Sequence, residues 1–134
     1  MIHDIDHIAV VVRNIEEKLP LYLEVLGFKL KNIEDVPHMG VRVAMLHSAD
    51  GTTHLELVQP VKPDTGVARF LEKKGEVIHH VCLLVEDLQS ELDRLKQRGV
   101  RLIDEVPRQG EGGSLVAFLH PEACHGVLVE LKQR

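Results

Sequence analysis

The sequence predicts an α+β fold built from two copies of one β-α-β-β-β module that pair into a curved mixed sheet. Residues 7–22, HIAVVVRNIEEKLPLY, align with residues 80–95, HVCLLVEDLQSELDRL, at a constant offset of 73. VAMLH at 43–47 matches VAFLH at 116–120 at the same offset, and LEL at 55–57 matches VEL at 129–131 at an offset of 74. A match that persists through a strand, a helix and later strands indicates one unit used twice.

The first strand and the helix of each module carry clear signals. Apolar, β-branched runs at 8–12 and 81–85 are typical of buried strands. Asn14 and Asp87 follow them as N-caps, and apolar residues then recur at helical spacing until Gly27 and Gly99, which suit left-handed C-caps. Pro20 lacks an N–H after the first turn, so it predicts a kink or a late helix start.

Three short strands are expected after each helix, at 28–34, 41–47 and 53–58 in the first copy and at 101–105, 114–119 and 127–132 in the second. Glycine- and proline-rich stretches separate them. We expect a single domain of residues 1–134, with a first module at about 1–60, a connector with a short helix at about 61–77, and a second module at about 78–134.

The composition is that of a soluble globular protein. The chain has 134 residues, of which 44% are hydrophobic, so it can bury a core. Its 16 basic and 21 acidic residues give a net charge of -5, which argues against a nucleic-acid surface. No apolar run approaches the length of a bilayer span, so we expect a cytoplasmic protein that binds neither nucleic acid nor membrane.

Each module places one histidine on its first strand and one glutamate on its last. His7 and Glu56 are 49 residues apart, and His80 and Glu130 are 50 apart. Singly, such residues are usually a hydrogen-bonded core histidine and a solvated carboxylate. Their recurrence in both copies favours convergence on one divalent metal, because two imidazoles and two carboxylates form a mixed nitrogen and oxygen site. Such a donor set suits Co²⁺, Mn²⁺, Ni²⁺ or Zn²⁺.

Other reactive side chains have ordinary interpretations. His79 points to the face opposite His80, and His47 and His120 stand at strand ends, where capping or loop packing is expected. Cys82 and Cys124 are interpreted as buried or inert thiols, because nothing near them in the sequence lowers a thiol pKa.

Several segments resemble the vicinal-oxygen-chelate (glyoxalase-like) superfamily, and within it the methylmalonyl-CoA epimerases are most similar. These segments are DHIAVVV, LGF, HMGVRVAML, ELVQP, HHVCLLVEDL and FLHPEACHGVLVEL. The resemblance implies a homodimer whose sheet surrounds one divalent metal per subunit, with Co²⁺ favoured over Mn²⁺, Ni²⁺ or Zn²⁺. It also implies that His7, Glu56, His80 and Glu130 are the metal ligands.

The implied reaction interconverts R- and S-methylmalonyl-CoA by proton abstraction at C2 through a metal-stabilised enolate. Glu130 is the first choice as catalytic base. Glu56 is the candidate for the second catalytic base, because Val43 stands where some relatives carry a glutamate. Substrate-binding residues are not identified; Arg42, Arg108 and Lys62 are only cationic candidates for contacts to coenzyme A.

Three alternatives share the fold. A glyoxalase I-like lactoylglutathione lyase is the second candidate, since Glu56 with the other three residues is also similar to its ligand set, although arginines that would bind glutathione are not identified. A ligand-sequestering protein would most naturally lose metal ligands. An extradiol dioxygenase normally uses two histidines and one carboxylate, so the fourth ligand argues against it.

Overall fold

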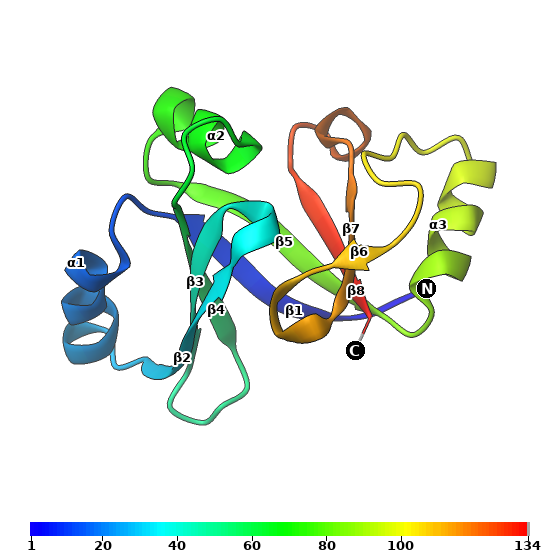
Figure 1. Cartoon of the computed structure of the whole chain (residues 1–134). Coiled ribbons are helices and arrows are strands. Elements are labelled where there is room, and N and C mark those ends of the chain that lie inside the picture. Colours follow the sequence, from blue (N-terminus) through cyan, green and yellow to red (C-terminus); the bar gives the residue numbers. More distant parts are fainter. Residues whose placement is uncertain (134) are drawn as a thin grey trace. The chain divides into compact units, whose positions relative to one another are not determined.

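The computed structural model describes residues 1–133, which form two compact units traced in Figure 1. The first unit runs from His7 to His79. The second combines Met1–Asp6 with the residues from His80 onward. Arg134, the last residue of the second predicted module, lies outside the described residues.

The first unit has a four-stranded mixed sheet in the order β2-β3-β4-β1. Strand β1 (Ile2–Val11) pairs in parallel with β4 (His54–Pro60), and β3 (Val41–His47) lies antiparallel between β4 and β2 (Lys29–Val36). The helical segments are α1 (Ile15–Leu19), the π-helical turns η1 (Pro20–Val25), the 3-10 turn η2 (Pro37–Met39) and α2 (Gly66–Lys74). The predicted order of the module and its connector helix are confirmed.

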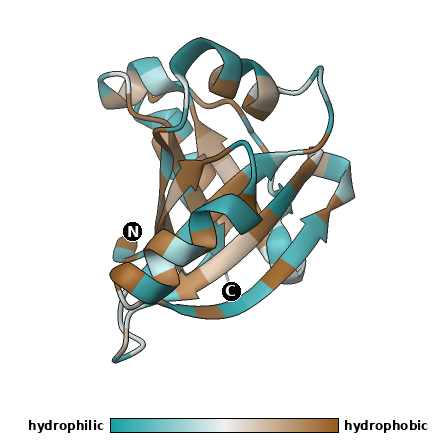
Figure 2. Ribbon diagram, turned by 90° about the vertical axis from the view of Figure 1, so that its left-hand side faces the viewer, coloured by the Kyte–Doolittle hydropathy of each residue, from teal (hydrophilic) through white to brown (hydrophobic). Residues whose placement is uncertain are grey.

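The first helix begins after its N-cap, Asn14, and changes helix type at Pro20, the two positions that the sequence indicates. The Asn14 side chain accepts a hydrogen bond of 2.9 Å from the N–H of Glu17, as expected of an N-cap. The irregularity predicted at Pro20 is a change of helix type, because the segment from Pro20 onward forms wider turns in which Leu26 N–H donates to the carbonyl of Leu21. Figure 2 shows hydrophobic and hydrophilic residues mixed along the helical ribbons; in this segment Leu23 packs against the core, whereas Leu21 and Val25 are exposed.

The sheet of the first unit is apolar on both faces. One cluster, on the side of α1, contains Val12, Ile15, Ala44, Leu46 and Leu57. A second cluster contains Ala9, Val36, Val41, Val43 and Val58. Because strand side chains alternate, Glu56 shares the face of Val58 and His7 shares the face of Ala9. Both candidate ligands of this unit therefore lie on the face opposite α1.

The second unit repeats this construction in the strand order β5-β8-β7-β6. Strand β5 (Ile78–Val85) is parallel to β8 (Val129–Gln133), and β7 (Leu115–Leu119) is antiparallel to both β8 and β6 (Arg108–Gln109). The helical segments are α3 (Leu88–Gln97) and the 3-10 turns η3 (Glu111–Gly113) and η4 (Pro121–Cys124). Asp87 caps α3 by accepting from the N–H of Ser90, as predicted.

The prediction of a strand at 101–105 is wrong. This segment has only an isolated bridge between Leu102 and Leu119, and the strand forms later, at β6. The reason lies in Asp104, whose carboxylate accepts the N–H of Phe118 at 2.8 Å in place of a strand carbonyl. A side chain that takes a ladder hydrogen bond ends regular pairing.

The core of the second unit lies between α3 and one face of the sheet. It contains Val85, Leu88, Leu92, Ala117, Leu119, Val129 and Leu131. By alternation, His80 and Glu130 lie on the opposite face. No helix among residues 1–133 is long and apolar enough to cross a bilayer.

Candidate active site

His7 and Glu56 form a buried pair in the first unit. Ala9 is the register partner of Glu56 across the parallel strands β1 and β4, so the imidazole two residues before Ala9 reaches the carboxylate diagonally. His7 Nε2 lies 3.2 Å from Glu56 Oε2. The two residues are only 1% and 3% exposed.

His80 and Glu130 form the corresponding pair in the second unit. Cys82, two residues after His80, is the register partner of Glu130 across the parallel strands β5 and β8. His80 Nε2 lies 3.1 Å from Glu130 Oε1, and the residues are 5% and 4% exposed. The Phe118 ring meets the His80 ring edge-on, with centroids 5.6 Å apart. The register and the distance match those of the first pair.

The donor set of each pair fits a divalent metal. Neighbouring nitrogen and oxygen ligands at about 2.0–2.2 Å from one ion lie roughly 3 Å from each other, which agrees with the 3.2 and 3.1 Å separations. A buried carboxylate is costly unless a cation or hydrogen bonds compensate it. The structure thus brings His7 to Glu56 and His80 to Glu130, while the sharing of one ion by both pairs stays a prediction.

A charged cluster that the sequence did not predict lies on the same sheet face as Glu130. Lys132 Nζ lies 3.2 Å from Asp6 Oδ2 and 3.2 Å from Glu111 Oε1. Burial lowers the pKa of Lys132, but the charges of Glu111 and Asp6 outweigh it, and the pKa is raised above its ordinary value. The signal in the sequence is a lysine two residues after Glu130, within a strand whose other face is apolar.

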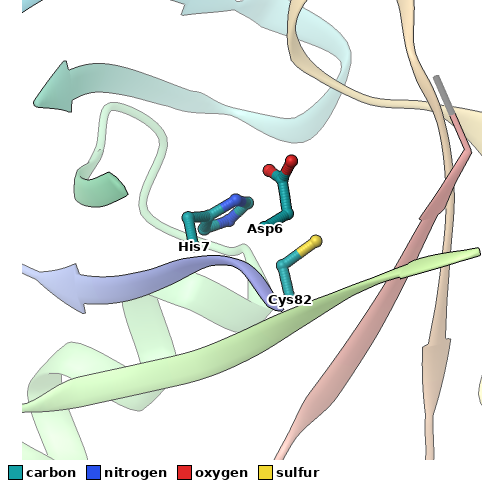
Figure 3. A group of neighbouring side chains, drawn as sticks. All are labelled: Asp6, His7 and Cys82. Atoms are coloured by element: carbon teal, nitrogen blue, oxygen red, sulfur yellow. The ribbon is translucent and has the colours of Figure 1, made fainter. Parts of the chain in front are cut away.

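The Cys82 thiol is buried, as predicted. It is fully buried, and Figure 3 shows it on β5 with Asp6 on β1. Burial raises the pKa of the Cys82 thiol strongly, and the negative charges of Glu130 and Asp6 raise it further. The thiolate that nucleophilic chemistry requires is therefore disfavoured. The pKa of Cys124 is also raised by burial.

Val43 carries no acid–base group into the site. It is 3% exposed and packs with Val41, Val58 and Ala9 in the apolar cluster of the first unit. Two further histidines have the predicted local roles: His47 Nδ1 lies 2.8 Å from the Ser48 carbonyl oxygen, and His120 Nδ1 accepts the N–H of Glu122.

His79 contacts an aromatic ring. Its imidazole meets the ring of Phe70 on α2 edge-on, with centroids 4.7 Å apart. The His79 ring therefore packs against α2.

The three cationic candidates for coenzyme A differ in their surroundings. Arg42 binds both carboxylate oxygens of Glu16, at 3.1 and 2.9 Å. Arg108 lies over the ring of Phe118, 5.3 Å from its centroid. Lys62 lines a pocket of about 460 Å³ in the first unit, where β4 ends and α2 begins. The other lining residues are Arg13, Pro60, Val61, Pro63, Ala68, Leu71 and Glu72.

The chain is similar in sequence and in structure to several known proteins. Residues 6–118 match the Glyoxalase/Bleomycin resistance protein/Dioxygenase superfamily. The uncharacterized protein YqjC of Bacillus subtilis is 40% identical over 127 residues, which cover 95% of this chain and 89% of that protein. The mitochondrial methylmalonyl-CoA epimerase of Bos taurus is 37% identical over 130 residues, covering 96% and 73% of the two chains. A structure of Streptomyces coelicolor methylmalonyl-CoA epimerase with 2-nitronate-propionyl-CoA is 34% identical, with a TM-score of 0.91 and coverages of 99% and 95%.

Proposed function

Because this chain belongs to the glyoxalase/bleomycin resistance protein/dioxygenase superfamily, we propose that it is an isomerase that epimerises methylmalonyl-CoA at C2. The observation that carries the proposal is the buried His–Glu pair that each unit builds at the same register. Supporting it is the similarity of nearly the whole chain to proteins named as methylmalonyl-CoA epimerases.

In this proposal His7, Glu56, His80 and Glu130 hold one divalent ion per subunit, with Co²⁺ favoured and Mn²⁺, Ni²⁺ or Zn²⁺ as alternatives. When bound, the ion supplies Lewis acidity that stabilises the negative charge developing on the thioester oxygen. The imidazoles and carboxylates of the chain fix its position. Their burial keeps water from competing for the same positions.

Glu130 is the proposed base for the α-proton. Its carboxylate is 4% exposed and lies beside the His80 imidazole, so it is held in place and poorly hydrated. The returning proton must reach the other face of the planar carbon, and of the residues singled out in the sequence Glu56 is the candidate for that step.

The pocket at Lys62 is the proposed site for the phosphate end of coenzyme A. Strand β4 runs four residues from Glu56 to Pro60, which is about 13 Å. An acyl-CoA carries its phosphates at the far end of a long pantetheine arm, so an acyl group near Glu56 leaves the phosphates in reach of this pocket. Lys62 supplies positive charge and the prolines supply apolar surface, while Arg13 is shared with Glu76, 3.7 Å away, and Glu72 adds one negative charge to the lining.

The quaternary state and the location belong to the same proposal. The resemblance to the epimerases supports a homodimer, and a cytoplasmic location agrees with the composition. An acyl-CoA thioester is the proposed small-molecule partner.

A lactoylglutathione lyase is the second candidate, because Glu56 gives the chain two histidines and two glutamates at the pairs described above. The reaction would use the same proton abstraction on a hemithioacetal. Arg42 offers little support for glutathione binding, because Glu16 and Asp35 already neutralise it.

A chirality assay tests the proposal. The Co²⁺-loaded protein is incubated with S-methylmalonyl-CoA, and the thioester is then reduced to 3-hydroxy-2-methylpropanoic acid, whose enantiomers are separated by chiral chromatography; free methylmalonic acid would not serve, because it has no stereocentre. The proposal predicts an approach to equal amounts of R and S. Retention of the S form, together with turnover of the hemithioacetal of methylglyoxal and glutathione, would replace the epimerase with the lyase.

A further inference from the structure

Each unit carries a glutamine near the end of its last strand whose side chain binds the start of the helix that follows the histidine strand. In the first unit Gln59 Oε1 accepts the N–H of Ile15 at 3.0 Å, and in the second Gln133 Oε1 accepts the N–H of Leu88 at 2.7 Å. The sequence repeats around both glutamines, because ELVQ at 56–59 matches ELKQ at 130–133 at an offset of 74. The two units therefore share a second contact besides the His–Glu pair.

The glutamines supply an acceptor that the N-caps do not. The first N–H groups of a helix have no partner within the helix. Asn14 and Asp87 each accept the N–H of the third helical residue, which leaves the N–H of the first one. Those first residues, Ile15 and Leu88, are fully buried, so their N–H groups need an acceptor from the protein. In both units that acceptor comes from the strand that carries the glutamate.

Each glutamine lies on the strand face opposite the candidate ligand. Side chains three residues apart on a strand point to opposite faces. Glu56 and Gln59 therefore leave β4 on opposite sides, and Glu130 and Gln133 do the same on β8. The glutamines lie on the side of the helix and its apolar cluster. The helix thus holds the strand from one side, while the carboxylate is presented on the other.

These hydrogen bonds fix a strand register that no tight turn fixes. Strands β1 and β4, like β5 and β8, are parallel neighbours joined by a long crossover with a helix and two strands. A slip of two residues would keep every side chain on its face but move the carboxylate about 6.6 Å along the strand. The histidine, 3.2 Å away in one pair and 3.1 Å in the other, would then be out of reach.

The link from histidine to carboxylate has the same length in both units. The bound N–H lies eight residues after the histidine, and the glutamine lies three residues after the glutamate. Because the helix begins directly after the histidine strand, its first N–H is fixed relative to that strand. The glutamine side chain therefore ties the strand of the glutamate to the strand of the histidine.

We propose that Gln59 and Gln133 are positioning residues for Glu56 and Glu130; this inference rests on the metal-binding role that the proposed function gives to the His–Glu pairs. Neither glutamine supplies a ligand atom, since each lies on the helix side of its strand. Each sets how closely its glutamate approaches the paired histidine, and thereby the affinity of that pair for a divalent cation.

The test is Gln133→Met in the whole chain, which keeps the length of the side chain and removes the oxygen acceptor. Calorimetric titration of the metal-free protein with Co²⁺ measures the dissociation constant, and amide hydrogen exchange at Leu88 checks that the hydrogen bond is lost. The dissociation constant should rise about fivefold, the effect of one hydrogen bond. Gln133→Glu keeps an oxygen acceptor and should bind Co²⁺ within about twofold of the wild type.

Asp87→Ala is the matched control, because it removes another acceptor at the start of the same helix without changing β8. It should lower the thermal unfolding midpoint about as much as Gln133→Met, yet keep the Co²⁺ dissociation constant within about twofold of the wild type. An equal loss of Co²⁺ affinity in the two variants would overturn the inference. Unchanged Co²⁺ affinity in Gln133→Met, with faster exchange at Leu88, would also overturn it and leave helix capping as the role.

The first unit offers an independent comparison, of Gln59→Met with Asn14→Ala, which serves if Gln133→Met does not fold. The same difference in Co²⁺ affinity is expected there, and equal affinities would count against the inference. Absence of Co²⁺ binding by the wild type would instead remove the metal-binding role on which the proposed function rests, and this inference with it.

Discussion

His80 Nε2 and Glu130 Oε1 lie 3.1 Å apart on two parallel strands of the second unit. The first unit builds the same relationship at 3.2 Å from His7 and Glu56. In both pairs the histidine stands two residues before the register partner of the glutamate. Equal register in two copies places the same two donors on the same sheet face, which is the physical basis for assigning them a common role.

Glu130→Gln should abolish epimerisation and leave the fold intact. The amide cannot take the α-proton and is a weaker metal ligand, so turnover should fall at least about 100-fold, while the thermal unfolding midpoint of the metal-free protein changes little. Glu122→Gln is the control, because that carboxylate is 75% exposed and pairs with exposed Arg101 at 2.8 Å. Near-normal turnover in Glu130→Gln would remove its roles as base and ligand.

His80→Ala should lower the metal content more than His79→Ala. The His80 ring adjoins the Glu130 carboxylate, whereas the His79 ring packs on Phe70. Loss of one metal ligand removes a coordinate bond, while loss of an aromatic contact removes packing alone. Elemental analysis after dialysis against Co²⁺ measures the difference, and the reverse order would show that the other histidine binds the metal.

Lys132→Met should destabilise the fold by about 3 kcal/mol, because it leaves Asp6 and Glu111 without the cation between them. Urea unfolding measures the change. Lys96→Met is the matched control: its partner Glu105 and Lys96 itself are both 63% exposed, so that loss should stay below about 1 kcal/mol. Equal effects of the two substitutions would contradict the burial of the cluster around Lys132.

Asp50 should titrate at an unusually low pH. The Ser48 hydroxyl, 2.6 Å away, and the N–H and hydroxyl of Thr52 hold the pKa of the Asp50 carboxyl at about 2. A folded-state pKa below the unfolded value stabilises the turn above about pH 3.9, and the contribution is lost as the pH falls toward 2. Carbon NMR of the carboxyl should show this, and Ser48→Ala should move its midpoint upward.

The repeat makes the four candidate ligands predictable from the sequence. A constant offset pairs His7 with His80, and strand alternation then assigns each side chain to a face. The caps at Asn14 and Asp87 were predictable for the same local reason, since their side chains bond only three residues ahead. Contacts of short sequence separation depend little on the rest of the chain.

The charged cluster could not be predicted in this way. Asp6, Glu111 and Lys132 come from the first strand, a loop and the last strand, and no local pattern connects them. The strand expected at 101–105 failed for a related reason, because Asp104 competes for the N–H of Phe118, a residue 14 positions away. Such contacts join residues far apart in the sequence, so they depend on the tertiary structure and not on a local pattern.

Proton NMR of methylmalonyl-CoA in deuterated water, with metal-stripped protein and with protein reconstituted with Co²⁺, tests the central claim most directly. A metal-dependent epimerase should incorporate deuterium at C2 and lose chirality only in the reconstituted sample. Equal incorporation with and without metal would contradict the role of the His–Glu pairs as ligands. Absence of incorporation in the reconstituted sample would contradict the epimerase itself.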